Sequence, residues 1–279
     1  MTPATSPSPN VFDSWGGDSR AGILERIASL GSRRNGLRLA SLLVVLTLWE
    51  LWGRANPFFA SYPSAIGAAG IEIFLPEVVP AFITTLVAFF TGLAIAVPIG
   101  MAIGFGMGLV RLLDVALTPY INAIYATPRI ALIPVLVLWL GIDFNLRVAI
   151  VALGAVFPVI VNTYTGTKHV DPELLDAGRA FMAPHQKILR TIVVPSAAPF
   201  VFAGIRIGIG RAVSGVIVAE MTSALTGVGR MLISHAKYLQ IDELFVSVIT
   251  LGLFSLLLLS ALTMVQRRMT PWSNAEQMR

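Results

Sequence analysis

Between Glu77 and Arg111, the sequence runs for 33 residues without an Asp, Glu, Lys or Arg. An α-helix needs about 20 apolar residues to cross the hydrocarbon core of a bilayer. Of the 279 residues in the chain, 13% are charged and 56% are hydrophobic, whereas soluble domains carry about 25% charged residues. These observations predict an all-α, polytopic membrane protein and exclude a soluble globular domain.

Six transmembrane helices are predicted. The apolar runs that predict them cover residues 38–54, 81–109, 115–140, 146–166, 197–221 and 244–265. The third run is interrupted by Pro119, Pro128 and Pro134, which favour bends or breaks in a helix. With the amino terminus inside the cell, the cytoplasmic segments hold 13 Lys and Arg and the opposite segments hold 4. Since cytoplasmic loops are enriched in Lys and Arg, both termini are predicted to be cytoplasmic.

The chain is expected to have three parts. They are a cytoplasmic N-terminal tail (1–37), a six-span domain (38–268) and a cytoplasmic C-terminal tail (269–279). In the N-terminal tail, Asp18 or Ser19 is a good N-cap for a short amphipathic helix that ends at Gly31. This helix either lies on the inner membrane surface or packs on the helix bundle. Another short helix is expected outside the membrane at residues 64–75.

Several function classes lack the residues that they need. The chain has no Cys, which excludes disulfides, thiolate zinc sites and iron–sulfur clusters. His169, His185 and His235 fall in three separate segments, so a histidine metal site is not expected. No Gly-x-x-x-x-Gly-Lys-Ser/Thr phosphate-binding loop occurs in the sequence. We therefore expect no catalytic residue, cofactor or metal in this chain.

Two sets of glycines are spaced for close helix contact. Gly100, Gly104 and Gly108 recur at four-residue steps in the second span, and Gly204 and Gly208 do so in the fifth. Small residues let helices approach closely in lipid, where no hydrophobic force acts between them. The glycines are predicted to pack helices tightly, and whether these contacts also slide during a change of state is left open.

One cytoplasmic segment, residues 168–195, is longer and more charged than the other connections. Asp171 is a good N-cap and Pro172 a good first residue for a helix. That helix is expected to end before Pro184, and a second short helix is expected to run as far as Pro195. A short amphipathic helix held between two spans can fit a groove on another protein or lie flat on the lipid. Both interpretations remain open at this point.

The same segment resembles the cytoplasmic motif of permease subunits of binding-protein-dependent ABC importers. The family motif is Glu-Ala-Ala, three residues, Gly, nine residues and Ile-x-Leu-Pro. This sequence has Asp176-Ala177-Gly178, three residues, Met182, nine residues and Ile192-Val193-Val194-Pro195. The departures are Asp for Glu, Gly for the second Ala, Met for Gly and Val for Leu. Met182 stands where the family's Gly allows a sharp turn, and Pro184 is expected to supply that break instead.

Further segments resemble the nitrate/sulfonate/taurine branch of this family. They cover residues 126–134, 138–142, 152–158, 162–164, 203–212 and 218–221. The resemblance implies a type I ABC importer permease fold with six spans in the bacterial cytoplasmic (inner) membrane. It also implies partners: a second permease copy in a homodimer, two ATPase subunits that bind ATP and Mg²⁺, and an external solute-binding protein. No nucleic-acid partner is expected, because the net charge of +5 follows the membrane topology.

By this resemblance, the helix over residues 172–183 contacts the ATPase and couples it to transport. The residues carried over to that contact are Pro172, Glu173, Asp176, Ala177, Gly178, Phe181, Met182 and Pro195. The chain would then be a translocation subunit and not an enzyme, because ATP is hydrolysed by its partner.

Three arginines lie inside predicted spans: Arg129, Arg206 and Arg211. A charge at the bilayer centre costs at least about 2.5 kcal/mol, so these side chains are expected to face the bundle interior or a water-filled path. Either they contact an anionic solute, since guanidinium groups pair well with anions, or they have a structural role. In that role, Arg206 and Arg211 bond to carbonyl groups freed by prolines or pair with Glu220 or Asp143. Arg129 is the preferred pathway residue. Glu220 is included in the candidate pathway set, although it is expected to anchor the loop that follows it.

A stand-alone secondary transporter or channel is the alternative function. It would predict inverted repeats and paired intramembrane acids for ion coupling, and neither is apparent in the sequence. A membrane-embedded enzyme would need a nucleophile and a base on facing helices, and no His or Asp lies deep enough in the spans for that role. The importer permease that the resemblance implies is therefore the preferred function, with a small anionic solute whose identity the sequence does not specify.

Overall fold

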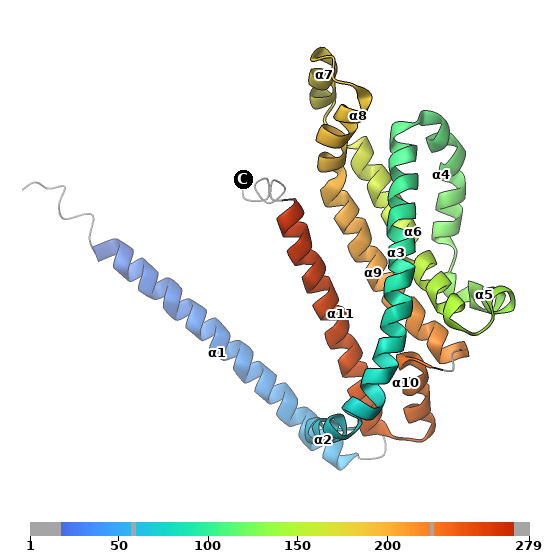
Figure 1. Cartoon of the computed structure of the whole chain (residues 1–279). Coiled ribbons are helices and arrows are strands. Elements are labelled where there is room, and N and C mark those ends of the chain that lie inside the picture. The colour runs from blue at the N-terminus through green and yellow to red at the C-terminus, as the bar shows by residue number, and fades with distance from the viewer. Residues whose placement is uncertain (1–17, 57–59, 224–225, 271–279) are drawn as a thin grey trace, which may run out of the picture. The chain divides into compact units, whose positions relative to one another are not determined.

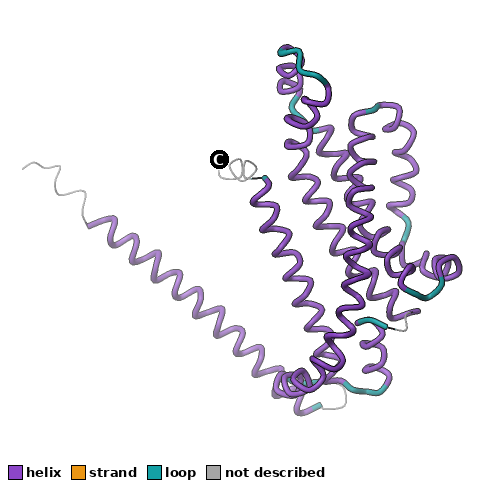
Figure 2. The backbone as a smooth tube through the Cα atoms, viewed as in Figure 1, coloured by secondary structure: helices purple, strands orange, loops and turns teal. Residues whose placement is uncertain are grey.

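The structure is a computed structural model of the chain (Figures 1 and 2), and it describes residues 18–56, 60–223 and 226–270. These residues form α-helices with short 3₁₀ and π-helical segments, and no strand occurs among them. The predicted all-α fold class is confirmed. Internal contacts divide the chain into two units, residues 1–64 and residues 65–279, and each unit is described by itself.

In the first unit, helix α1 (Asp18–Ala55) runs without a break. The sequence predicts a helix end at Gly31, but the helix continues through it and includes the first predicted span. A single Gly costs a helix only about 1 kcal/mol relative to Ala, and the next proline, Pro57, comes after the end of α1. Nothing in the local sequence is therefore strong enough to end the helix at Gly31.

The second unit begins within helix α2 (Pro63–Ile73), close to the helix predicted over residues 64–75. A π-helical segment, η1 (Phe74–Val78), joins α2 to α3 (Val79–Leu109), and the three form one helix of 47 residues. Pro76 and Pro80 lie at this junction. A proline removes a hydrogen bond from the helical ladder, and the wider π turn accommodates it without ending the helix.

Helices α3, α6 (Phe144–Lys168) and α9 (Val194–Ser223) form the centre of the second unit, and α6 packs against both of the others. Their shared core includes Phe89, Val151 and Val216, one from each helix, and all are at most 1% exposed. In the most apolar window of α6, 56% of the residues are buried, compared with 11% in α11 (Ile241–Met269). Helix α6 is therefore the central helix of this unit.

The five glycines selected from the sequence lie at these helix contacts. Gly100 faces Val159 and Gly104 faces Thr163, and an added Cβ would come within 2.8 Å and 2.6 Å of these side chains. The remaining contacts pair Gly108 with Thr167, Gly204 with Asn162 and Gly208 with Ala155. The absence of a Cβ is what lets α3 and α9 approach α6 this closely.

Gly104→Val is expected to destabilise the protein by about 1–3 kcal/mol, as is typical when a packed interior is overfilled. An added Cβ at Gly104 lies 2.7 Å from the carbonyl oxygen of Ile160, which cannot move without α6. Thermal unfolding in detergent micelles measures the change. The matched control is Gly252→Val in α11, where nothing lies within 4 Å of an added Cβ. Equal losses of stability in the two variants would contradict the assignment of Gly104 to a tight contact between α3 and α6.

The third predicted span is a broken one. Helix α4 (Arg111–Ala126) and the following segment, made of η2 (Arg129–Leu132) and α5 (Ile133–Leu140), are bent by 90°. Pro128 precedes η2 and Pro134 lies in the first turn of α5, positions where a missing N–H and a fixed φ favour a new start. Counting this bent pair as one span gives six with the five continuous helices, in agreement with the prediction. We refer to residues 111–140 as the α4–α5 arm.

The long loop of the sequence forms a projecting helix. Helix α7 (Pro172–Ala180) begins after Asp171, whose carboxylate accepts a hydrogen bond from the Glu173 N–H at 2.8 Å. Helix α8 (His185–Ile188) and the π segment η3 (Leu189–Val193) then lead directly into α9. The predicted helix end at Pro195 is wrong, because the π turn accommodates this proline and the helix His185–Thr222 is continuous.

The remaining helices lie toward the other end of the second unit. Helix α10 (Val228–Lys237) follows α9 and packs against both α9 and α11. In Figure 1, α7 and the turn between α3 and α4 lie at one end of the bundle, and α10 lies at the opposite end. The bundle thus has a loop end, marked by α7, and an α10 end.

Candidate functional site

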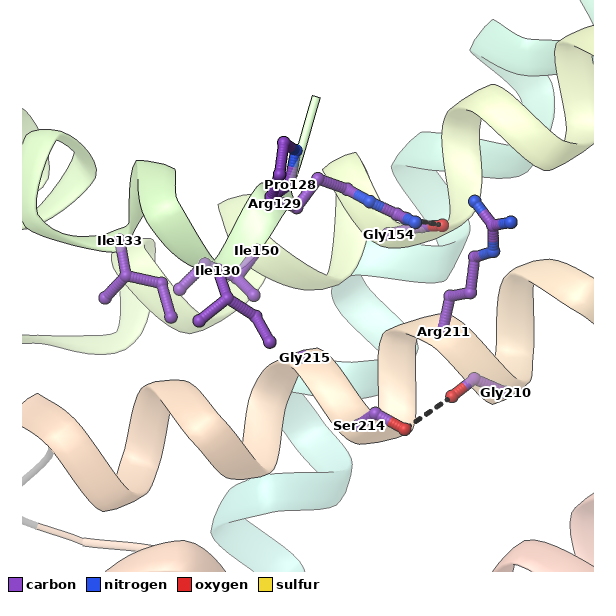
Figure 3. Close-up of a pocket in the computed structure, with 10 residues that line it drawn as sticks. All are labelled: Pro128, Arg129, Ile130, Ile133, Ile150, Gly154, Gly210, Arg211, Ser214 and Gly215. Atoms are coloured by element: carbon purple, nitrogen blue, oxygen red, sulfur yellow. Dashed lines mark hydrogen bonds between the residues drawn. The ribbon is translucent and has the colours of Figure 1, made fainter. Parts of the chain in front are cut away.

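A cavity of about 310 Å³ lies between the α4–α5 arm, α6 and α9. The arm contributes Pro128, Arg129, Ile130 and Ile133, α6 contributes Ile150 and Gly154, and α9 contributes Gly210, Arg211, Ser214 and Gly215. Figure 3 shows these ten residues. Arg211 lies near the middle of the 30-residue helix α9, so the cavity is at membrane depth.

Two guanidinium groups line this cavity. Arg129 donates a hydrogen bond from Nη1 to the Gly154 carbonyl oxygen at 2.9 Å, and the Arg211 guanidinium lies over the Tyr125 ring, 4.6 Å from its centre. Neither arginine forms an ion pair with a carboxylate within the described residues. Because both groups are cations beside the same cavity, they repel each other, and an anion between them would relieve that repulsion.

The cavity has a cationic part and an apolar part. Ile130, Ile133 and Ile150 point into it on one side, and Arg129 and Arg211 lie toward the other in Figure 3. Gly210 and Ser214 are exposed on the surface of α9 beside it. Few charged groups around a mainly apolar cavity are typical of a site that orients a small molecule.

Arg206 lies outside this cavity. Its Nη2 donates to the Thr263 hydroxyl at 2.9 Å and to Gln266 Oε1 at 3.3 Å, so it links α9 to α11. The structure therefore brings together two of the three membrane-depth arginines, Arg129 and Arg211. The expected pairing of Arg206 or Arg211 with Glu220 or Asp143 is wrong within the described residues, because Arg206 bonds to α11 and Glu220 pairs with Arg147.

Glu220 belongs to a buried polar cluster near the α10 end. Its carboxylate is 1% exposed and accepts hydrogen bonds from the Thr85 hydroxyl at 2.9 Å and from the Gly229 N–H at 3.0 Å. Arg147 Nη1 lies 3.4 Å from the same carboxylate, and the Val228 N–H donates to the Thr85 hydroxyl at 3.0 Å. The cluster fixes the start of α10 to α3, α6 and α9, and it is separate from the arginine cavity.

Helix α7 presents two large apolar side chains at its end. Phe181 is 88% exposed and Met182 is 91% exposed. Met182 has a φ of +51°, a left-handed conformation that costs an L-residue roughly 1–2 kcal/mol. Gly178, in contrast, packs inward, since an added Cβ would lie 3.1 Å from the Ile192 side chain. The helix is thus held against α8 and η3 on one face, while its tip projects into open space.

Comparison with known proteins gives the family. The family model for the binding-protein-dependent transport system inner membrane component matches residues 96–273. The chain belongs to this family. It is the membrane-spanning permease subunit of an ABC importer. A separate subunit of the importer hydrolyses ATP.

Relatives place the permease in the sulfonate and taurine branch of the family. The taurine transport system permease protein TauC of Escherichia coli is 28% identical over 261 residues, which are 88% of this chain and 93% of the relative. The putative aliphatic sulfonates transport permease protein SsuC of Bacillus subtilis is 28% identical over 184 residues, which are 66% of this chain and 67% of the relative.

A solved structure shows the same fold. One chain of an amino acid ABC transporter superposes on this permease with a TM-score of 0.58 and 19% identity, over 71% of this chain and 97% of that chain. The predicted importer permease fold is therefore confirmed.

The structure of the permease brings together residues that no pattern in the sequence connects. Arg147 carries a charge at the start of the fourth predicted span, and nothing in the sequence pairs it with Glu220, which is 73 positions away. Thr85 and Tyr125 were also missed, because a hydroxyl or a ring inside an apolar run carries no pattern of its own. One sequence signal could have indicated the cluster. Glu220 and Arg147 lie in two different apolar segments, where a charged side chain needs a partner of opposite charge.

Proposed function

We propose that the cavity beside Arg129 and Arg211 is one subunit's share of the translocation path, and that it takes a small organic anion. Two guanidinium groups without a carboxylate partner, at membrane depth, carry this proposal. Guanidinium groups suit sulfonate and carboxylate oxygens, and Ile130, Ile133 and Ile150 suit an apolar body on the same molecule. The sulfonate and taurine permeases among the relatives agree with an anionic solute.

A second copy of the permease is proposed to complete the path. The cavity borders the exposed residues Gly210 and Ser214 of α9, and lipid on this side would meet two arginines at a high energetic cost. A second copy packed there through the small residues would exclude lipid and bring a second pair of arginines to the path. This arrangement corresponds to the homodimer that the family resemblance implies.

The tip of α7 is proposed to contact a separate ATPase on the cytoplasmic side. Exposed Phe181 and Met182 beside the charged residues Glu173, Asp176 and Arg179 suit a groove on a protein better than a flat lipid surface. ATP and Mg²⁺ would then be bound by two ATPase subunits, and an external binding protein would deliver the solute at the α10 end. Both termini of the permease would be cytoplasmic.

Uptake into proteoliposomes tests the proposal. The permease is reconstituted with its ATPase and binding protein, and uptake of taurine, butanesulfonate and nitrate is measured with and without internal MgATP. ATP-dependent uptake of an organic anion is expected, together with copurification of the ATPase. Uptake by the permease alone, without ATP, would instead support a secondary transporter or channel.

Arg211→Gln is expected to lower the apparent affinity of transport by about 10- to 100-fold, because a hydrogen bond to a charged group contributes about 1.5–3 kcal/mol. The matched control is Arg206→Gln in the same helix, whose partners Thr263 and Gln266 lie outside the cavity. The concentration dependence of anion uptake measures the effect. A similar loss of affinity in both variants would argue against the cavity as the anion path.

A further inference from the structure

Helix α4 is held to the rest of the bundle by little apolar contact. Ile121 is its one buried residue, and it packs with Met107 of α3 and with Phe157 and Ile160 of α6. Leu117 and Tyr125 of α4 are partly buried against the same cluster. Yet α4 is the first part of the α4–α5 arm, and the second part of this arm places Arg129 in the cavity. Polar contacts with α6 therefore add to this apolar cluster in positioning the arm when the bundle changes state.

Two polar contacts attach the arm to α6. Asp114 lies in the first turn of α4, and Lys168 is the last residue of α6. Asp114 Oδ2 and Lys168 Nζ are 3.0 Å apart. The Thr118 hydroxyl donates to Asp114 Oδ1 at 3.0 Å, and the Lys168 ammonium lies 5.7 Å from the centre of the Tyr164 ring. At the bend of the arm, Arg129 donates to the Gly154 carbonyl of α6, as described above.

Lys168 also begins the segment of residues 168–195 that carries α7, which we call the coupling loop. It is the last residue of α6, and Asp171, three positions later, is the N-cap of α7. A displacement of α7 is therefore transmitted first to the end of α6, where Lys168 holds α4. Lys168 is thus the contact of the arm with α6 that lies nearest to the loop.

From this geometry we infer that the Lys168–Asp114 ion pair is a positioning contact that makes the α4–α5 arm move with α6 and the coupling loop, and so carries Arg129 with them. The inference rests on the proposed coupling function and adds the residues that transmit the motion. The pair is partly exposed, with side-chain exposures of 41% for Lys168 and 19% for Asp114. Such a pair contributes little to overall stability, so substitutions of it are expected to leave the fold intact and to change only how the arm follows α6.

The test measures a distance across the contact. The chain has no Cys, so nitroxide labels can be attached to Tyr120→Cys on α4 and Lys187→Cys on α8, both at exposed positions. Electron–electron resonance then gives the distance between the two labels of one permease copy when the labelled permease is diluted with unlabelled permease. It is measured in the reconstituted importer without nucleotide and with MgATP trapped by vanadate. With the ion pair intact, the distance is expected to be the same in the two states.

Lys168→Met and Asp114→Asn are each expected to give a second, longer distance in the trapped state only. The exchange of both residues, Asp114→Lys with Lys168→Asp, is expected to restore the single distance. Arg54→Met is the control, since it removes the ion pair with Glu50 inside α1 and should leave the distance unchanged. A single distance in both trapped variants, or no restoration by the exchange, would overturn the inference. Failure of the unsubstituted permease to bind the ATPase would overturn the proposed function itself.

Discussion

Glu220→Ala is expected to destabilise the permease by about 3–5 kcal/mol, the usual cost of breaking a buried ion pair by removing one partner. Arg147 is 7% exposed and would keep its charge without the carboxylate. The Gly229 N–H and the Thr85 hydroxyl would also lose their acceptor, and an unsatisfied buried donor adds to the loss. Thermal unfolding of the purified permease in detergent measures the change.

The double variant Glu220→Leu with Arg147→Met separates the charge from the packing. Replacing both members of a buried pair by apolar residues of similar size is often close to neutral, so this variant is expected to recover most of the stability. Asp176→Ala, which removes the partner of the exposed Arg179, should change the unfolding temperature little. Stability losses that simply add in the double variant would contradict a direct Glu220–Arg147 interaction.

Gly227 shows that the cluster also constrains the backbone. Its φ is +99°, and an added Cβ would collide with the Glu220 carboxylate. The turn before α10 thus needs a residue without a side chain, both for its conformation and for the space that Glu220 occupies. The start of α10 is therefore fixed to Glu220 of α9, at the end of the bundle opposite α7.

Much of the helical arrangement could be predicted from the sequence, because the bilayer imposes it. Uncharged runs, such as the one between Glu77 and Arg111, locate the spans through their length alone. Asp171 and Pro172 predict the start of α7 through local capping, which depends on neighbouring residues only. The glycines of the second and fifth spans indicate contact faces, and the structure adds which side chains they meet.

The remaining features depend on long-range contacts or on weak local preferences. Arg129, Arg206 and Arg211 look equivalent in the sequence, and only the packing separates the two that line a cavity from the one that bonds to α11. Pro195 suggests a helix end, whereas the π segment η3 leads into α9 and the helix continues through this proline. Helix ends are thus poorly predicted where a one-residue bulge can replace a break.

Helix α6 contributes residues to the cavity, to the buried cluster around Glu220 and to the contact with α4. It contributes Ile150 and Gly154 to the cavity, Arg147 to the buried cluster and Lys168 to the contact with α4. Its end leads into the loop that carries α7. A rigid-body movement of this central helix would therefore act on the cavity and on both ends of the bundle together.

Phe181→Arg is expected to weaken binding of the ATPase by about 30-fold or more, since losing a central aromatic anchor of an interface costs at least about 2 kcal/mol. Phe181 is 88% exposed at the tip of α7, with Met182 beside it, so its substitution should leave the fold of the permease intact. ATP-driven uptake should fall with the affinity. Binding of the purified ATPase to the permease in nanodiscs measures the first effect, and proteoliposome uptake measures the second.

Two further variants test whether the tip acts through contact or through its shape. Tyr238→Arg changes an aromatic residue that is 69% exposed at the α10 end of the bundle, and it should leave ATPase binding unchanged. Met182→Gly removes the left-handed strain of an L-residue and is expected to stabilise the loop by about 1 kcal/mol. It should also weaken ATPase binding, but less than Phe181→Arg, because one apolar side chain is lost and no charge is introduced. Unchanged ATPase binding in Phe181→Arg would show that α7 is not the contact, and the proposed coupling route would then be wrong.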